Sequence, residues 1–163
     1  MEPLNHSSGK YSFRELGLWQ KAQSFAVDIV RLVEGLPRRG STDVIGRQLI
    51  RAASSIAANV AEGHGRYTLA AYRNHLQIAK GSASESLSWL DLLLRLGQIE
   101  AGGGKMLEDR CEELIAALTT RILMLERAEQ NRRLRDDVAH YNVVDAGHEE
   151  TGSKVQGFQG QVE

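Results

Sequence analysis

The chain of 163 residues is long enough for one domain with a single buried core, and its apolar and charged contents, 42% and 25%, are those of a globular protein. Its lone cysteine, Cys111, excludes an intramolecular disulfide and favours a reducing, cytoplasmic compartment. The net charge of −1 is unevenly placed, because residues 10–135 carry 19 Lys and Arg against 14 Asp and Glu, and residues 136–163 carry 1 against 6. The mildly basic body favours an anionic partner. No signal-peptide pattern and no run of about 18 apolar residues is present, so neither secretion nor a membrane span is expected.

Four segments with helical periodicity are predicted, after a polar N-terminal segment, residues 1–10, that is expected to be disordered. Ser12 and Glu15 have the spacing of a capping box, so the first helix is predicted to begin at Ser12. Apolar residues then recur every three or four positions as far as Leu36. Pro37 ends this helix, because proline disfavours helical geometry in the residue before it.

The second and third helices are separated by a glycine-containing turn. Ser41 or Thr42 is the predicted N-cap of the second helix. The Gly-His-Gly stretch at 63–65 is predicted to end it, because glycine tolerates the left-handed geometry of a C-cap. Thr68 is the predicted N-cap of the third helix, which runs to about Leu96.

The fourth helix follows a run of glycines at 101–104, which is predicted to be a flexible turn. The helix is predicted from about Lys105 to Leu134, where the apolar periodicity fails, and residues 135–163 are predicted to form a disordered acidic tail. Short connections force neighbouring helices to run antiparallel. The sequence therefore predicts an all-α, antiparallel up-and-down four-helix bundle over residues 11–134, with disordered termini.

The third and fourth helices carry apolar residues on more than one face, which predicts a homo-oligomer. A helix that is hydrophobic most of the way round needs a second surface to bury against, and large exposed apolar patches mark interfaces. The additional apolar residues are Ile78, Trp89, Leu92, Leu93, Leu96, Met106, Ile115 and Leu123.

Polar residues recur along one face of the second helix, at spacings of four, four and three, and continue on the third helix. One interpretation is a polar binding site. The other is a structural network whose members pair inside the bundle, because an unpaired buried polar group costs about 1–3 kcal/mol. The residues are Arg51, Ser55, Asn59 and Glu62 on the second helix and Ser82 and Glu85 on the third.

No motif for metal binding or catalysis is recognised, so no catalytic residue, no metal and no cofactor is expected. Di-iron sites in helical bundles need a Glu-x-x-His sequence, which does not occur, and the histidines lack ligand-like spacing. Walker loops, nucleophile elbows and Cys-x-x-Cys pairs do not occur either. Cys111 is predicted to be a small buried side chain.

Basic residues of the second and third helices are candidates for contacts to nucleic-acid phosphates. Tyr67 and Tyr72 lie beside two of them in the sequence and suit stacking on bases. The alternative is a solvated charged surface with cation–π contacts. The candidate nucleic-acid-binding residues are Arg47, Arg51, Arg66, Arg73 and Lys80. Arg132, Arg133 and Arg135 form a second basic cluster.

One short motif suggests a different function. Arg135 and His140 match the Arg-x4-His motif of HEPN ribonucleases, which are also helical bundles. In that resemblance the arginine stabilises phosphate charge and the histidine performs acid–base chemistry. A HEPN-like ribonuclease using Arg135 and His140 is therefore an alternative function.

Longer motifs resemble one family over roughly residues 10–130, the 23S rRNA intervening-sequence family of bacterial four-helix-bundle proteins. The resemblance implies a ring-like homo-oligomer, with a pentamer expected, and a relation to the Avd accessory proteins of diversity-generating retroelements, which bind reverse transcriptase and nucleic acid. The near-neutral net charge and the acidic tail depart from that branch. The motifs are Phe13-Arg-Glu-Leu16 with Trp19-Gln20, Gln48-Leu-Ile-Arg51-Ala-Ala53, Ser55-Ile56, Asn59-Val-Ala-Glu-Gly63, Arg66, and Ile78-Ala-Lys-Gly-Ser82 with Glu85.

These observations favour a non-enzymatic, oligomeric bundle that binds copies of itself and either RNA or a nucleic-acid-binding protein. A protein-interaction scaffold without nucleic-acid binding is the alternative in which the polar residues serve only the fold.

Overall fold

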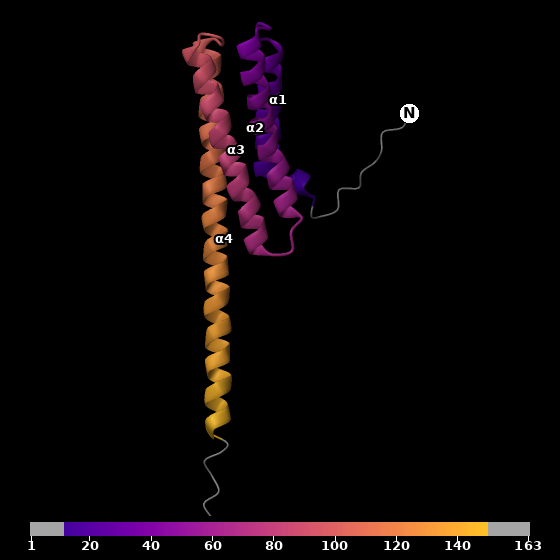
Figure 1. Ribbon diagram of the computed structural model, residues 1–163. Coiled ribbons are helices and arrows are strands. Elements are labelled where there is room, and N and C mark those ends of the chain that lie inside the picture. Colours follow the sequence, from indigo (N-terminus) through magenta and orange to yellow (C-terminus); the bar gives the residue numbers. More distant parts are fainter. Residues whose placement is uncertain (1–11, 150–163) are drawn as a thin grey trace, which may run out of the picture. The chain divides into compact units, whose positions relative to one another are not determined.

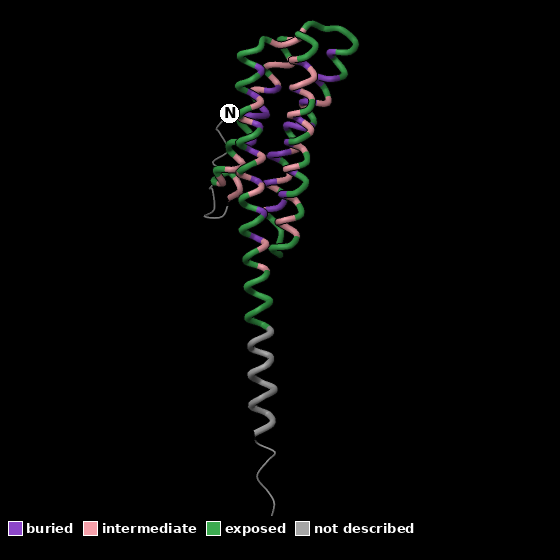
Figure 2. Tube along the Cα trace, turned by 90° about the vertical axis from the view of Figure 1, so that its left-hand side faces the viewer, coloured by how far each residue is buried: buried purple, intermediate pink, exposed green. Residues whose placement is uncertain are grey.

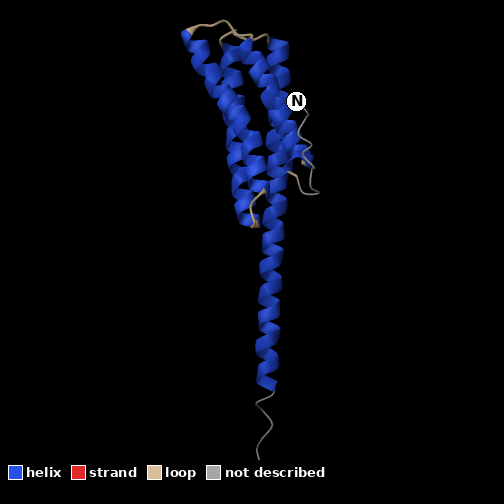
Figure 3. Cartoon of the chain, turned by 90° about the vertical axis from the view of Figure 1, so that its right-hand side faces the viewer, coloured by secondary structure: helices blue, strands red, loops and turns tan. Residues whose placement is uncertain are grey.

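The computed structural model describes residues 12–149, with side chains described over residues 12–136. This part of the chain is helical, without a strand (Figure 1, Figure 3), which confirms the predicted all-α class and its four long helices. None of the described helices has both the length and the apolar character needed to cross a membrane. The elements are the 3₁₀ turn η1 (Phe13–Glu15) and the helices α1 (Gly17–Glu34), α2 (Gly40–His64), α3 (Leu69–Arg95) and α4 (Ala101–Glu149).

The chain divides into two compact units between Glu126 and Arg127. The first unit contains η1, α1, α2, α3 and the beginning of α4, and it is the four-helix bundle. The second unit, over its described residues, is the continuation of α4. The compact unit thus ends before Leu134, the predicted limit of the bundle.

The bundle core is made by the inward faces of its helices, which Figure 2 shows as buried segments on facing sides. Phe25 of α1, Leu49 of α2, Leu76 of α3 and Leu118 of α4 are fully buried. Each fully buried side chain of this size contributes about 1.5–3 kcal/mol relative to an exposed one. The three- and four-residue spacing of such residues therefore explains why these segments fold as helices and pack together.

The helices pack in the cyclic order of an up-and-down bundle. α2 contacts both α1 and α3. α4 closes the bundle against α1, where Arg110 forms an ion pair with Asp28 and donates to Ser24 Oγ at 3.2 Å. α4 also contacts α3, because the thiol of Cys111 donates to the carbonyl oxygen of Ala83 at 3.1 Å.

Two of the predicted helix starts are corrected by the structure. Ser12 Oγ accepts a hydrogen bond from Arg14 N at 3.3 Å, but it caps the 3₁₀ turn, and α1 begins only at Gly17. Neither Ser41 nor Thr42 caps α2, which begins at Gly40. Thr42 is buried instead, with its Oγ1 3.4 Å from Gln98 Oε1.

The third predicted start is confirmed, and α2 ends at His64 as predicted, but the predicted left-handed geometry of its C-cap is corrected. The Thr68 side chain accepts from the backbone N–H three residues later, at 3.1 Å, and caps α3. Gly65 follows α2 with φ of −78°, so it is right-handed rather than left-handed. The left-handed glycine is Gly97, with φ of +61°, which directs the chain from α3 towards α4.

The glycine run at 101–104 is helical rather than a flexible turn. The carboxylate of Glu100 accepts hydrogen bonds from Gly102 N and Gly103 N, both at 2.7 Å. These bonds, from Gly102 first and Gly103 second, lower the pKa of Glu100. An acidic N-cap thus offsets the poor helix propensity of three successive glycines.

α4 continues to Glu149, so residues 135–149 are helical where the sequence predicts a disordered tail. The apolar stripe does stop before this segment, but helix propagation depends on local hydrogen bonds, and no proline interrupts the segment. The predicted disordered segments 1–10 and 150–163 lie outside the described residues.

Candidate functional site

The polar residues predicted on the second and third helices meet along the contact between α2 and α3. We call this row of side chains the polar seam. At its centre Ser55 Oγ lies 2.9 Å from Ser82 Oγ. Asn59 Nδ2 donates to Ser55 O at 2.9 Å and to Ser55 Oγ at 3.0 Å. The centre of the seam is therefore a hydrogen-bonded chain that links the two helices.

One end of the polar seam is an ion pair between the helices. Arg51 Nη2 lies 3.2 Å from Glu85 Oε1. The same oxygen accepts a hydrogen bond from Trp89 Nε1 at 3.3 Å. The carboxylate is thus held by a charged and a neutral donor, and Arg51 is occupied by a partner.

The other end of the polar seam is a cluster around His75. Arg66 pairs with Glu62 and also donates from Nε to His75 Nε2 at 3.1 Å. Since Nε2 accepts this bond, the neutral ring carries its proton on Nδ1, which faces Asn59 Oδ1 at 3.4 Å. Glu62 Oε1 lies 3.8 Å from His75 Nε2. The ring is therefore fixed from both sides.

A close approach of the backbones accompanies this cluster. A Cβ atom at Gly63 would lie 2.8 Å from His75 Cβ and 2.8 Å from Tyr72 Cδ2. Only glycine fits between α2 and α3 at this position without a shift of one helix.

The structure thus brings together all six residues predicted for the polar network and adds two that the sequence reading missed. His75 precedes Ser82 by seven residues, and Trp89 follows Glu85 by four, so both lie on the same helix face as the predicted pair. The spacing that identified the network therefore contained the signal for these two residues as well.

The five candidate nucleic-acid-binding residues do not lie on one face. Arg51 and Arg66 lie in the polar seam with acidic partners. Lys80 lines a groove between α3 and α4 together with Thr119 and Leu123. Arg73 is seven residues before Lys80 and therefore shares its side of α3.

The fifth candidate, Arg47, is exposed on α2 and forms no ion pair with a described residue. Tyr67, which the sequence also suggests for stacking, is fully exposed in the connection between α2 and α3.

A second arrangement, which the sequence reading missed, lies where α1 begins. We call it the α1 groove. The guanidinium of Arg121 on α4 lies over the ring of Tyr72 on α3, 5.7 Å from its centroid. The sequence gives no signal for this contact, because the two residues are far apart in the chain and only the fold joins them. The α1 groove is lined by Leu16, Gly17, Leu18, Tyr72, Ala117, Thr120, Arg121 and Met124.

Groups suited to metal binding or nucleophilic catalysis are not gathered in the described part of the chain. No cluster of three His, Cys, Asp or Glu side chains there is placed to hold a metal ion. Cys111 is fully buried, and burial raises the pKa of its thiol to about 12. Arg135 is exposed on α4, and His140 lies in the same helix with its side chain outside the described residues.

The additional apolar residues of α3 and α4 separate into two groups. Leu93 belongs to the core of the bundle, so it is not available for an interface as the sequence reading expected. Trp89, Leu92 and Ile115 pack partly against that core. The residues that keep about half of their surface exposed are Ile78, Leu96, Met106 and Leu123.

Comparisons with known proteins agree with this architecture. Residues 14–120 match the family model described as 23S rRNA-intervening sequence protein. No curated protein matches the chain. Among solved structures, a protein of unknown function from the S23 ribosomal protein family of Bacteroides thetaiotaomicron is similar, with 30% sequence identity and a TM-score of 0.61, over 64% of this chain and 97% of that one. The matched segment covers most of the bundle and all of the polar seam, and the chain belongs to the 23S rRNA-intervening sequence protein family.

Proposed function

We propose that the chain is a non-enzymatic, oligomeric bundle that binds nucleic acid or a ribonucleoprotein. The observation that carries this proposal is the excess of positive charge over residues 38–80, which span α2, the connections on either side of it and the first half of α3. Residues 38–80 contain seven Lys and Arg against two Asp and Glu, a net charge of +5. Basic side chains attract phosphate groups, and their binding releases the counterions that are condensed on the nucleic acid.

The family supports RNA as the polyanion. The matched model carries 23S rRNA in its description, and the similar solved protein is assigned to a ribosomal protein family. Both names refer to the ribosome or its RNA, and this supports RNA as the partner that we propose.

The basic residues are not equivalent in this proposal. Arg47 is exposed without an ion-pair partner among the described residues, so it is available for a phosphate at once. Arg51 and Arg66 contact phosphate only if their ion pairs with Glu85 and Glu62 break, and breaking these pairs costs part of the binding free energy. Arg73 and Lys80 lie on the side of α3 that faces away from the seam and form a second, weaker contact region, because Lys80 shares its groove with the carboxylate of Glu126.

The proposal is tested by binding of a structured RNA hairpin over a series of salt concentrations. Affinity should fall linearly on logarithmic axes, and replacing Arg47 by Gln should reduce the slope by about one unit, since each lost phosphate contact removes roughly 0.9. Lys21→Gln is the matched control, because Lys21 is exposed on α1 and outside the proposed surface. No binding at low salt, or an affinity independent of salt, overturns the proposal.

The oligomer is part of the same proposal, and a homopentamer is the assembly that we propose. Apolar side chains remain half exposed on α3 and α4, at Ile78, Leu96, Met106 and Leu123. A second copy of the chain is the partner that would bury them. Sedimentation velocity should give one large species that Leu123→Glu dissociates, whereas a monomeric wild type contradicts the assembly.

A protein-interaction scaffold is the second candidate, and the closed hydrogen bonding of the polar seam favours it. The donors and acceptors at the centre of the seam bind one another across α2 and α3. In a scaffold, Asn59→Ala with Glu62→Gln lowers the melting temperature and dissociates the oligomer, and no RNA binds to the wild type. RNA binding that survives these changes favours the first candidate.

A further inference from the structure

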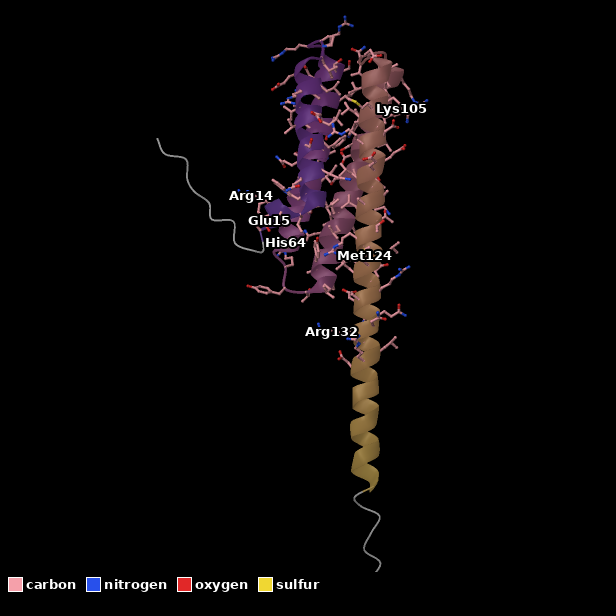
Figure 4. All side chains as sticks on the ribbon, turned by 180° about the vertical axis from the view of Figure 1, so that it is seen from behind. Arg14, Glu15, His64, Lys105, Met124 and Arg132 are labelled. Atoms are coloured by element: carbon pink, nitrogen blue, oxygen red, sulfur yellow. The ribbon has the colours of Figure 1, made fainter. Side chains whose placement is uncertain are left out.

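We propose that the α1 groove receives one unpaired nucleotide of a bound RNA, with the base on the apolar wall and the phosphate at Arg121. This inference rests on the proposed function and assigns a specific site to it. The groove lies within the bundle unit, and Figure 4 shows its residue Met124 at the same end as His64 and away from Lys105.

The size and lining of the groove suit a base. Its volume is about 450 Å³, within the range of about 300–1,000 Å³ that small-molecule sites occupy. Its apolar lining comes from Leu16 and Leu18 at the beginning of α1 and from Ala117 and Met124 on α4. Met124 is 55% exposed, so part of this lining faces water in the absence of a ligand. The flat face of a base can cover such apolar surface and remove it from water.

The charge of the groove selects an anion. Arg121 is the one charged residue among those that line it. Four further grooves of the bundle each combine basic and acidic side chains, for example Lys80 with Glu126 and Arg31 with Glu34. A phosphate entering those grooves meets a carboxylate, whereas in the α1 groove it meets only positive charge.

The cation of the groove is oriented by an aromatic ring. Arg121 lies over the face of Tyr72, and the Tyr72 ring is contacted edge-on by His64 with centroids 6.4 Å apart. A cation–π contact uses the flat face of the guanidinium and leaves its N–H donors at the edge free for phosphate oxygens. The close approach at Gly63 fixes Tyr72 from the α2 side.

The beginning of α1 adds charge of the same sign. Gly17 and Leu18 lie in the groove wall, and no side chain caps the helix. Its first N–H groups carry partial positive charge. This partial charge favours a phosphate near Arg121 and leaves the apolar lining of the groove free for the base.

The test uses a fluorescein-labelled single-stranded RNA, the same strand with one abasic sugar, and the perfect duplex, all with the full-length protein. The wild type should bind the intact strand about tenfold more tightly than the abasic strand, as expected for one stacked base. Thr120→Trp, which fills the groove from an exposed position, and Arg121→Gln should remove that preference and leave duplex affinity unchanged. Lys21→Gln is the matched control and should keep the preference.

The outcomes separate this inference from the proposed function. Equal binding of intact and abasic strands by the wild type overturns the inference, as does a preference that both groove variants retain. In either case duplex and strand binding still support the proposed function. Absence of binding to all three RNAs overturns both. Circular dichroism melts of the variants show whether the helices are retained.

Discussion

The polar seam and the α1 groove use the same residue types in opposite ways. In the seam Arg51 and Arg66 each face a carboxylate, of Glu85 and Glu62 respectively. In the groove Arg121 faces the ring of Tyr72. A carboxylate competes with phosphate for the guanidinium donors, and an aromatic face does not. The position of a cation, and not its presence, therefore decides whether it is available to a ligand.

The two regions also differ in how the fold makes them. The seam joins only α2 and α3, and its members repeat at helical spacing. The groove combines the start of α1 with side chains of α3 and α4. Substitutions that separate α2 from α3 should therefore disturb the seam first and reach the groove through Tyr72, which lines the groove and lies against Gly63 beside the seam.

The largest effect is expected at the close approach between the helices. Gly63→Ala places a Cβ 2.8 Å from His75 Cβ and from Tyr72 Cδ2, so one helix has to move. We expect a loss of about 2–3 kcal/mol in the free energy of unfolding, as for other overpacked sites. Urea denaturation followed by circular dichroism measures it.

Gly81→Ala is the matched control for that substitution. Gly81 is also inside a helix, but a Cβ there meets nothing within 4 Å. The change should stabilise the protein by about 0.5–1 kcal/mol, because alanine has the better helix propensity. Similar effects of the two substitutions would show that the close approach does not constrain the bundle.

The next largest effect is expected at the centre of the polar seam. Asn59→Ala removes the bonds from Nδ2 to Ser55 and leaves Nδ1 of His75 without its acceptor. We expect a loss of about 1–2 kcal/mol, the range for a partly buried hydrogen-bonded group. Ser54→Ala is the comparison, because Ser54 is exposed and bonds only carbonyl oxygens of its own helix. An equal loss in both variants contradicts a special role for the seam.

The polar seam could be predicted from the sequence and the α1 groove could not, because a sequence pattern contains only local information. The helices and the seam are local, since residues three, four or seven apart share a face whatever the rest of the chain does. This is why Arg51, Asn59 and Glu85 were predicted together. The groove depends on Tyr72 and Arg121 meeting across the bundle, and no local spacing encodes that contact.

The helix ends also show that local sequence signals predict only what depends on local contacts. Thr68 was predicted correctly because an N-cap acts on its own first turn. Thr42 has the same chemistry, but it is buried next to Gln98, which lies in the connection between α3 and α4. The low helix propensity of the glycines at 101–104 predicts a turn, but the carboxylate of Glu100 caps them as the start of a helix.

A smaller effect is expected at Cys111 of α4, whose buried thiol donates to the carbonyl oxygen of Ala83 on α3. Burial raises the pKa of this thiol to about 12, and so the native state holds the proton that the unfolded state releases near pH 9. The stability from this group is complete below pH 9 and is lost as the pH rises towards 12. Cys111→Ala should flatten that decline.

The same thiol reports on opening of the bundle. At pH 8 it should react with a disulfide reagent only through unfolding, so Asn59→Ala should speed the reaction about tenfold for each 1.4 kcal/mol of lost stability. Fast labelling of the folded wild type contradicts the burial of Cys111.

The smallest change in stability, and the sharpest separation of the two regions, is expected from Glu85→Gln. The side chains of Arg51 and Glu85 are 72% and 39% exposed, and an exposed pair contributes about 0.2–1 kcal/mol. Gln keeps an oxygen that can accept from Trp89 Nε1, so the fold should lose little stability.

Arg51, however, loses its competing charge in Glu85→Gln and becomes available to phosphate, as Arg47 already is. RNA affinity should rise, and its salt slope should steepen by up to about one contact. An unchanged salt slope with a large loss of stability would mean that Arg51 serves only the fold. The polar seam would then be purely structural, and only the α1 groove would bind RNA.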